Sequence, residues 1–189
     1  MINIQVNWKF LTARPYGIIL TGRMISSVTL TILMLSLRYK LHISEILTFI
    51  NAFIGFWSII SLTAHFFNLQ KNLSTVPDSY FYIPFAIVDF IFGIFGAILY
   101  TIETFIVFMG IINSYYYYLG DFLLILLTLV ICIVSAVIFG YYSLLLHVQT
   151  QNIKDLPIKE MVIEGDKITY YTPSERNNEK TLILKTMTI

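Results

Sequence analysis

The sequence predicts an all-α membrane protein, a bundle of four transmembrane helices with short loops and a cytoplasmic C-terminal tail. Hydrophobic residues make up 57% of the 189-residue chain and charged residues only 12%, and the mean hydropathy is +0.77. Soluble domains carry about 25% charged residues, so this chain has too few charges to cover a surface in water. In addition, four apolar runs are each long enough to cross about 30 Å of hydrocarbon as a helix.

The first two spans are predicted to form an antiparallel hairpin. The first covers about 16–37 and is interrupted only by Arg23, and the second covers about 43–67. Arg38 and Lys40 lie in the few residues between them, which are too few for a crossing to the other side of the membrane. Each span satisfies its own backbone hydrogen bonds by forming a helix, because lipid offers no partners.

The third and fourth spans differ in their charges. The third covers about 81–110 and carries Asp89 and Glu103, whereas the fourth covers about 122–147 and contains no charged residue. The tyrosine run Tyr115–Tyr118 lies between them, where a span meets the headgroups. Tyrosine and tryptophan are enriched at that depth, so we interpret the run as part of an aromatic belt.

The chain therefore divides into an N-terminal segment (1–15), a membrane domain (16–147) and a tail (148–189) that we expect to be partly disordered. Because the number of spans is even, both termini lie on one side of the membrane. Six lysines and arginines near the span ends belong to that side, and only Arg38 and Lys40 belong to the other. The excess predicts that both termini are cytoplasmic, in an endomembrane or the plasma membrane.

Charged side chains inside the spans predict contacts between helices. Such a charge costs at least about 2.5–3.5 kcal/mol at the centre of the membrane, so it should face the bundle and find a partner. Arg23 lies about 6 Å and Asp89 about 9 Å from the centre of its span, toward the same side, which predicts an ion pair. Glu103 points to nearly the same side of the third span as Asp89, and its predicted partner is Arg38 or Lys40.

Small and polar residues recur on one side of the second, third and fourth spans, at steps of three and four. Small residues let helix backbones approach closely, where dispersion and weak hydrogen bonds accumulate. The stripes therefore predict a helix-packing seam inside the bundle. The seam consists of Asn51, Gly55 and Ser58 on the second span, Gly93, Gly96 and Ala97 on the third, and Ala136 and Gly140 on the fourth.

The sequence contains none of the common patterns of catalysis or nucleic-acid binding. A net charge of +1 provides no field that attracts nucleic acid. The single cysteine, Cys132, can form neither an internal disulfide nor a thiolate cluster. No glycine-rich phosphate loop, nucleophile elbow or HExxH motif occurs. We therefore expect no enzymatic activity, no cofactor and no metal site.

Two interpretations of the intramembrane carboxylates remain open. Asp89 and Glu103 can stabilise the bundle, or they can form part of a proton or ion path in a small transporter or channel subunit. Transporters commonly have helices broken by glycine or proline, and internal repeats. The third span has no internal proline and the chain shows no repeat, which favours the structural interpretation.

The tail carries six basic and six acidic side chains, so it is too balanced for a lipid-binding polybasic segment. Within it, the apolar stretches on either side of Glu164-Gly165-Asp166 predict a short β-hairpin over Glu160–Tyr171. We interpret the tail as a sorting segment or a binding site for a cytoplasmic adaptor. The partners expected inside the membrane are lipid, other membrane proteins or a second copy of the chain.

The third span begins with Tyr82-Ile-Pro-Phe-Ala-Ile-Val-Asp-Phe90. This stretch resembles the start of the third span in the lysosome-associated tetraspan transmembrane proteins, whose luminal cysteines and proline-rich tail motifs are absent here. The short loops, the early basic residue in the first span and the acidic residue in the third are also similar to those of MARVEL-domain proteins. Both resemblances cover 16–147 and imply a non-catalytic role in vesicle trafficking or membrane organisation.

Overall fold

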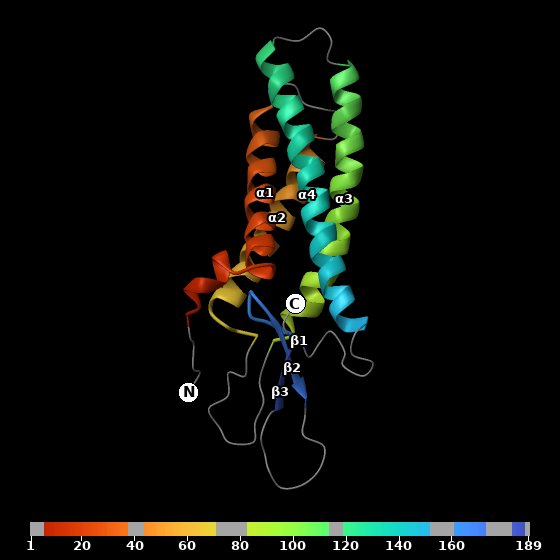
Figure 1. Cartoon of the computed structure of the whole chain (residues 1–189). Helices are drawn as coiled ribbons and strands as arrows, with labels where there is room; N and C mark the ends of the chain where they lie inside the picture. The colour runs from red at the N-terminus through yellow and green to blue at the C-terminus, as the bar shows by residue number, and fades with distance from the viewer. Residues whose placement is uncertain are drawn as a thin grey trace. The chain divides into compact units, whose positions relative to one another are not determined.

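The computed structural model describes residues 6–37, 44–70, 83–113, 119–151, 161–172 and 183–187 (Figure 1). Four long helices account for most of these residues: α1 (Tyr16–Ser36), α2 (Ser44–Phe66), α3 (Phe85–Asn113) and α4 (Leu119–Gln151). The short 3-10 helix η1 (Trp8–Thr12) precedes α1, and the strands β1 (Met161–Ile163), β2 (Ile168–Thr172) and β3 (Ile183–Met187) follow α4. The predicted all-α class with four membrane-length helices is confirmed.

The later helices depart from the predicted spans at their ends. α3 begins at Phe85 rather than near residue 81, because Pro84 lacks the N–H that an interior helical position needs and is tolerated just before or in the first turn. α4 runs from Leu119 to Gln151, beyond the apolar run at both ends. A helix pairs its own backbone groups, so it can continue from hydrocarbon into the headgroups without a change in hydrogen bonding.

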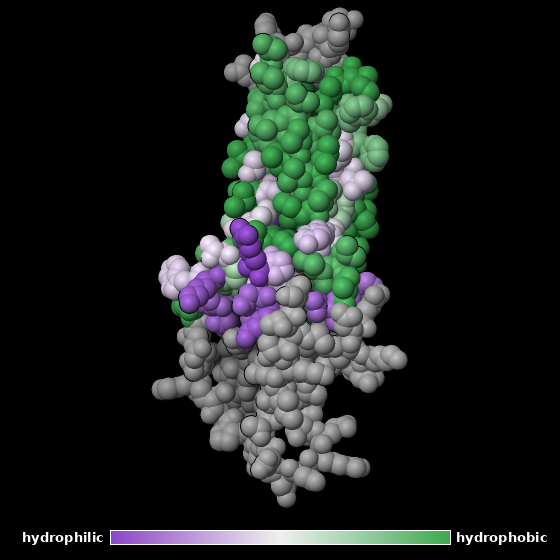
Figure 2. Space-filling view, viewed as in Figure 1, coloured by the Kyte–Doolittle hydropathy of each residue, from purple (hydrophilic) through white to green (hydrophobic). Residues whose placement is uncertain are grey.

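The outward faces of the helices are strongly apolar. Figure 2 shows hydrophobic side chains covering the helices almost continuously on the face in view. Leu35 and Phe49 are more than two-thirds exposed, and many isoleucine, leucine and phenylalanine side chains are at least half exposed. Soluble proteins do not expose apolar surface on this scale, whereas a bilayer matches it. The protein is therefore an integral, multi-pass membrane protein.

The chain forms two compact units, and each contains part of all four helices. The sheet unit consists of Met1–Thr21, Ile60–Ile91 and Tyr142–Ile189, and the helix unit consists of Gly22–Ile59 and Phe92–Tyr141. The core of the helix unit is built from aliphatic and aromatic side chains of all four helices, among them Leu30, Ile54, Tyr100, Ile125 and Phe139. Buried polar side chains occur in both units.

The sheet unit contains an antiparallel sheet with the strand order β1-β2-β3. Met161 pairs with Tyr170 and Ile163 with Ile168, so β1 and β2 form the predicted hairpin. Gly165 in the turn has a φ of 99°, a conformation that glycine adopts without strain. β3 adds a third strand that the sequence analysis did not predict.

Candidate functional site: buried polar clusters

Glu103 lies inside the helix unit, bonded to a neutral partner. The side-chain amide of Asn51 on α2 donates a hydrogen bond of 2.7 Å to Oε1 of Glu103 on α3, and both residues are buried. The thiol of Cys132 on α4 is a second hydrogen-bonding neighbour of this carboxyl group. Three helices therefore meet at one carboxyl group. The predicted partners of Glu103, Arg38 and Lys40, lie outside the described residues.

Arg23 is fully buried in the helix unit and lies over an aromatic ring. Its guanidinium carbon is 4.4 Å from the centroid of the Phe139 ring on α4, which is a cation–π contact. Phe139 in turn packs edge-on against Tyr100 of α3 with 5.1 Å between ring centroids. The Tyr100 hydroxyl donates to Oγ of Ser27, one turn after Arg23, at 2.9 Å. A desolvated cation–π contact contributes about 2 kcal/mol, so this cluster fastens α1 to α3 and α4.

The seam residues of the helix unit show how closely its helices approach. A Cβ added to Gly96 would lie only 2.3 Å from Cδ1 of Phe139, so the ring packs directly on the glycine backbone. A Cβ on Gly140 or Gly55 would meet its nearest neighbour at 3.6 Å, an ordinary contact distance. The remaining predicted seam residues are buried or half-buried: Asn51, Ser58, Gly93, Ala97 and Ala136.

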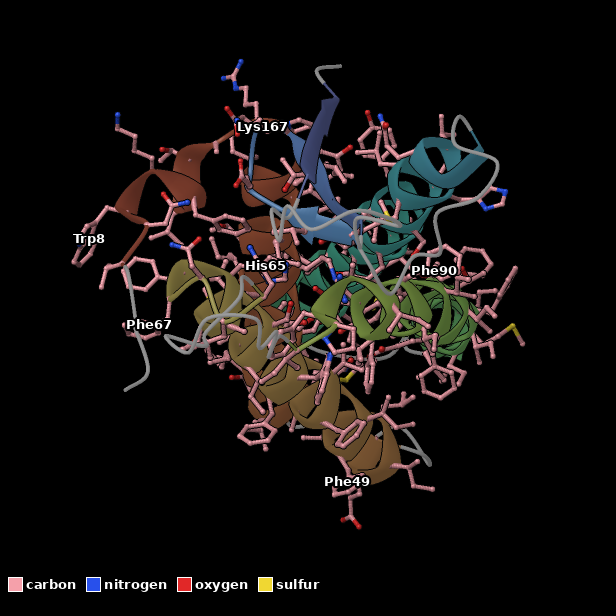
Figure 3. All side chains as sticks on the ribbon, turned by 90° about the horizontal axis from the view of Figure 1, so that it is seen from below. Trp8, Phe49, His65, Phe67, Phe90 and Lys167 are labelled. Atoms are coloured by element: carbon pink, nitrogen blue, oxygen red, sulfur yellow. The ribbon has the colours of Figure 1, made fainter. Side chains whose placement is uncertain are left out.

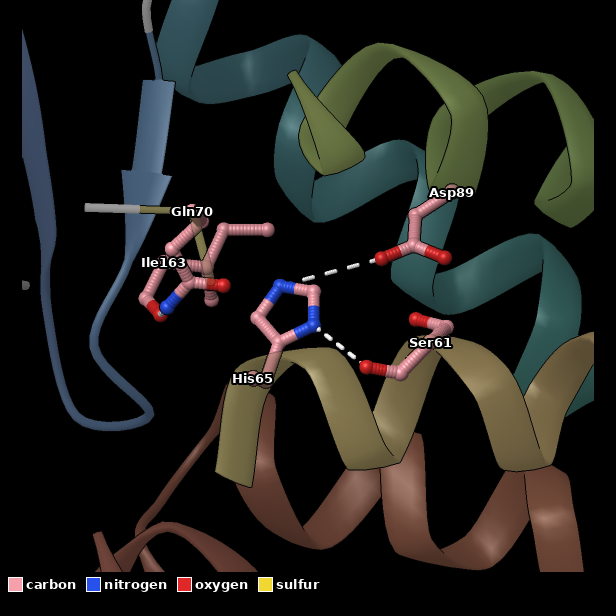
Figure 4. A network of polar contacts seen from close by, with 5 residues as sticks. All are labelled: Ser61, His65, Gln70, Asp89 and Ile163. Atoms are coloured by element: carbon pink, nitrogen blue, oxygen red, sulfur yellow. Dashed lines mark hydrogen bonds and ion pairs between the residues drawn. The ribbon is translucent and has the colours of Figure 1, made fainter. Parts of the chain in front are cut away.

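Asp89 belongs to the sheet unit, where it faces an imidazole (Figure 4). Nε2 of His65 on α2 lies 3.8 Å from Oδ2 of Asp89 on α3, and both side chains are buried. Nδ1 of His65 is 2.8 Å from the backbone oxygen of Ser61. A carbonyl oxygen only accepts hydrogen bonds, so Nδ1 carries a hydrogen and Nε2 is directed at the carboxylate. Among the described residues, no hydrogen bond reaches either oxygen of Asp89 or the hydroxyl of Ser61.

The contact between His65 and Asp89 was not predicted, although both lie near the same end of their spans. Their similar depth was the one sequence signal that could have indicated the contact. The predicted partner of Asp89, Arg23, belongs to the helix unit, so the Arg23–Asp89 ion pair stays a prediction. Among the described residues, no group of three histidine, cysteine, aspartate or glutamate side chains is arranged to hold a metal ion.

Aromatic side chains and the hairpin enclose His65. Phe10 of η1 stacks on its imidazole at 5.2 Å between ring centroids, and Phe85 of α3 lies at 6.1 Å. In Figure 3, His65 points inward among the elements of the sheet unit, whereas Trp8 points away from them. Figure 4 also shows Ile163 of β1 and Gln70 beside the imidazole.

Backbone hydrogen bonds attach the β1–β2 hairpin to the beginning of α1. The carbonyl oxygen of Gly165 accepts from the backbone N–H groups of Tyr16 at 3.0 Å and Gly17 at 3.2 Å. The first turn of a helix has N–H groups without partners inside the helix, and the hairpin supplies an acceptor for two of them. The side-chain amide of Gln70, just after α2, donates to the backbone oxygen of Ile163. The hairpin is thus bonded to the ends of two membrane helices.

Comparison of the chain with models of protein families, with curated proteins and with solved structures finds no match.

Proposed function

We propose that this integral membrane protein is non-catalytic and serves membrane organisation or vesicle trafficking. In this proposal both termini are cytoplasmic. The helices contact lipid and other membrane proteins, or a second copy of the chain, and the tail binds a cytoplasmic adaptor. The resemblance of the third span and of the four-span architecture to tetraspan trafficking proteins supports the proposal.

The observation that carries the proposal is the bond between Asn51 and Glu103. A carboxyl group inside a membrane span marks either a transport path or an internal brace. Here it accepts a hydrogen bond of 2.7 Å from a neutral amide on the neighbouring helix. A group held in this way favours a single arrangement of the helices, which suits a scaffold better than a carrier. The activity then resides in the surfaces and the tail.

The test follows the location of the tagged full-length chain in living cells. We expect the intact protein in an endomembrane or the plasma membrane, and removal of 152–189 should shift it to a different membrane. Gly120→Ala is the matched control, because no described residue places an atom within 4 Å of the added methyl group, and it should leave the location unchanged. Identical distributions of the full-length and truncated proteins would contradict a role for the tail.

A small transporter or channel subunit is the second candidate, and one observation favours it. No described residue gives a hydrogen bond to the buried carboxylate of Asp89, so it is less firmly held than Glu103. Purified protein in liposomes with an internal pH indicator distinguishes the candidates. Proton flux that Asp89→Asn abolishes and Asn51→Leu retains would support transport, and an absence of flux would support the scaffold.

A further inference from the structure

We propose that the β1–β2 hairpin, Met161–Thr172, is a removable plug that closes the aqueous access to the His65–Asp89 pair. The proposal concerns only the sheet unit and does not depend on the role in trafficking. It assigns the first part of the tail a function inside the protein, namely control of whether water reaches two ionisable groups at the end of the membrane helices.

The hairpin is seated as part of the protein interior. Met161, Val162, Ile163 and Ile168 are all at most 2% exposed, although a three-stranded sheet alone has no core to bury them in. A Cβ on Gly165 would lie 2.8 Å from Cβ of Ala13 and 3.1 Å from the Phe10 ring. The turn therefore lies against η1 with no free space.

A continuous series of contacts leads from the hairpin to the pair. The turn at Gly165 contacts Phe10, Phe10 stacks on the imidazole of His65, and His65 faces Asp89. In addition, Gln70, in the turn that follows α2, donates a hydrogen bond to the backbone oxygen of Ile163. Both side chains of the pair are buried; Phe10 of η1 stacks on His65, and Ile163 of the hairpin lies beside the imidazole.

The hairpin is attached to the ends of the membrane helices by contacts that water can replace. Besides the pairing of β2 with β3, its described attachments include the two N–H groups at the start of α1 and the amide of Gln70. All three donors can bond to water when the hairpin leaves. In contrast, the pair gains from hydration, because Asp89 and the hydroxyl of Ser61 accept no hydrogen bond from a described residue. When the hairpin leaves, a few apolar side chains lose their burial. In exchange, water can solvate His65 and Asp89.

Other described ionisable groups of the sheet unit make contacts of their own. Glu164 and Lys167 pair with each other across the turn at 3.3 Å. The phenol groups of Tyr16 and Tyr142 are buried in the same unit, and His147 stacks against Phe90. His65 and Asp89, which can carry opposite charges, therefore face each other next to β1 of the hairpin.

The experiment measures how fast a buried thiol becomes accessible. Cys132→Ser removes the only cysteine, and Ser61→Cys then places a thiol beside the pair. The full-length protein is placed in nanodiscs, where both faces meet the solution, and treated with a charged methanethiosulfonate reagent. Gly165→Val, which the turn cannot accommodate, and the milder Gln70→Ala weaken the attachment of the hairpin.

We expect slow reaction at residue 61 with the intact hairpin, and reaction at least about tenfold faster in Gly165→Val, with a smaller acceleration in Gln70→Ala. A thiol at Ser135, buried in the helix unit, is the matched control and should react equally slowly in all backgrounds. Two results would overturn the proposal: a rate at residue 61 that neither change alters, or equal acceleration at residue 135, which indicates general unfolding. Because Gln70→Ala leaves the turn intact, the test remains decisive if Gly165→Val does not fold.

Discussion

Gly96→Ala should destabilise the bundle because the added methyl group falls on the ring of Phe139. Its Cβ would lie 2.3 Å from Cδ1 and 2.8 Å from Cε1, so the ring must move by about 1 Å to regain ordinary contact. The ring is confined by Arg23 at 4.4 Å on one side and by Tyr100 at 5.1 Å on another. Any movement therefore disturbs a cation–π contact and an aromatic pair together.

The magnitude follows from three contributions. Overpacking of a close-packed interior costs about 1–3 kcal/mol. A weakened contact between Arg23 and Phe139 adds about 0.5–2 kcal/mol, because the guanidinium is desolvated. Alanine is a better helix former than glycine by up to about 1 kcal/mol, which opposes both. We therefore expect a net loss of about 0.5–4 kcal/mol. Gly140→Ala is the matched control: its methyl group would meet Cβ of Ala97 at 3.6 Å, so it should be neutral or slightly stabilising.

Both variants can be compared by titration with a denaturing detergent. Trp57 stacks on Phe92 between α2 and α3 with 4.6 Å between ring centroids, and in a Trp8→Phe background it is the only tryptophan. Its fluorescence then reports separation of these helices. Phe139→Leu should restore part of the stability lost in Gly96→Ala by making room for the methyl group. Equal midpoints for Gly96→Ala and Gly140→Ala would refute the reasoning.

Three further predictions concern the charges and the orientation. Asn51→Leu should lower the stability of the bundle by about 1 kcal/mol, and the double variant with Glu103→Leu should recover part of it in the same titration. Asp89→Leu should be destabilising and Arg23→Leu in the same chain should restore part of the loss; additive losses would show that the two residues do not pair. Antibodies should reach an epitope tag on either terminus only after the plasma membrane is permeabilised, and labelling of intact cells would reverse the orientation.

The membrane spans were predictable because hydropathy accumulates over some twenty residues and tolerates local exceptions. Arg23 and Glu103 do not interrupt the helices that contain them, since each helix still satisfies its own backbone. That Arg23, Asp89 and Glu103 lie inside the protein was predictable for the same energetic reason, the cost of a charge in lipid. Helix ends were less predictable, because polar residues such as Asp121 remain helical outside the hydrocarbon.

The partners of the buried charges were harder to predict. The partner of Glu103 was predicted by looking for an opposite charge at the same depth in the membrane. Its described partner is instead the neutral amide of Asn51. A neutral donor satisfies a carboxyl group without removing a second charge from water, which in an apolar interior offsets much of the Coulomb energy of an ion pair. The rotation of α2 that presents Asn51 depends on the packing of whole helices. Asn51 and Glu103 were both predicted to face inward, but not to meet.

The attachment of the hairpin had no sequence signal, because most of it is backbone. The oxygen of Gly165 bonds to N–H groups of Tyr16 and Gly17, and every residue except proline offers such groups. β3 was missed for a related reason, since its pairing with β2 joins residues separated by a long connection, and register is set by the whole sheet.

The buried carboxyl groups of the two clusters differ in how they are hydrogen-bonded. This difference indicates which part of the protein can change conformation. Glu103 accepts a direct hydrogen bond from a side chain whose own helix is packed on all inward sides, so releasing it requires the helices to separate. Asp89 faces an imidazole at 3.8 Å, beyond hydrogen-bonding distance, in the unit whose hairpin is hydrogen-bonded to Tyr16, Gly17 and Gln70 and paired with β3. Local opening favours segments whose contacts water can replace. Within the sheet unit, any regulated change in hydration should therefore begin at the hairpin and reach Asp89.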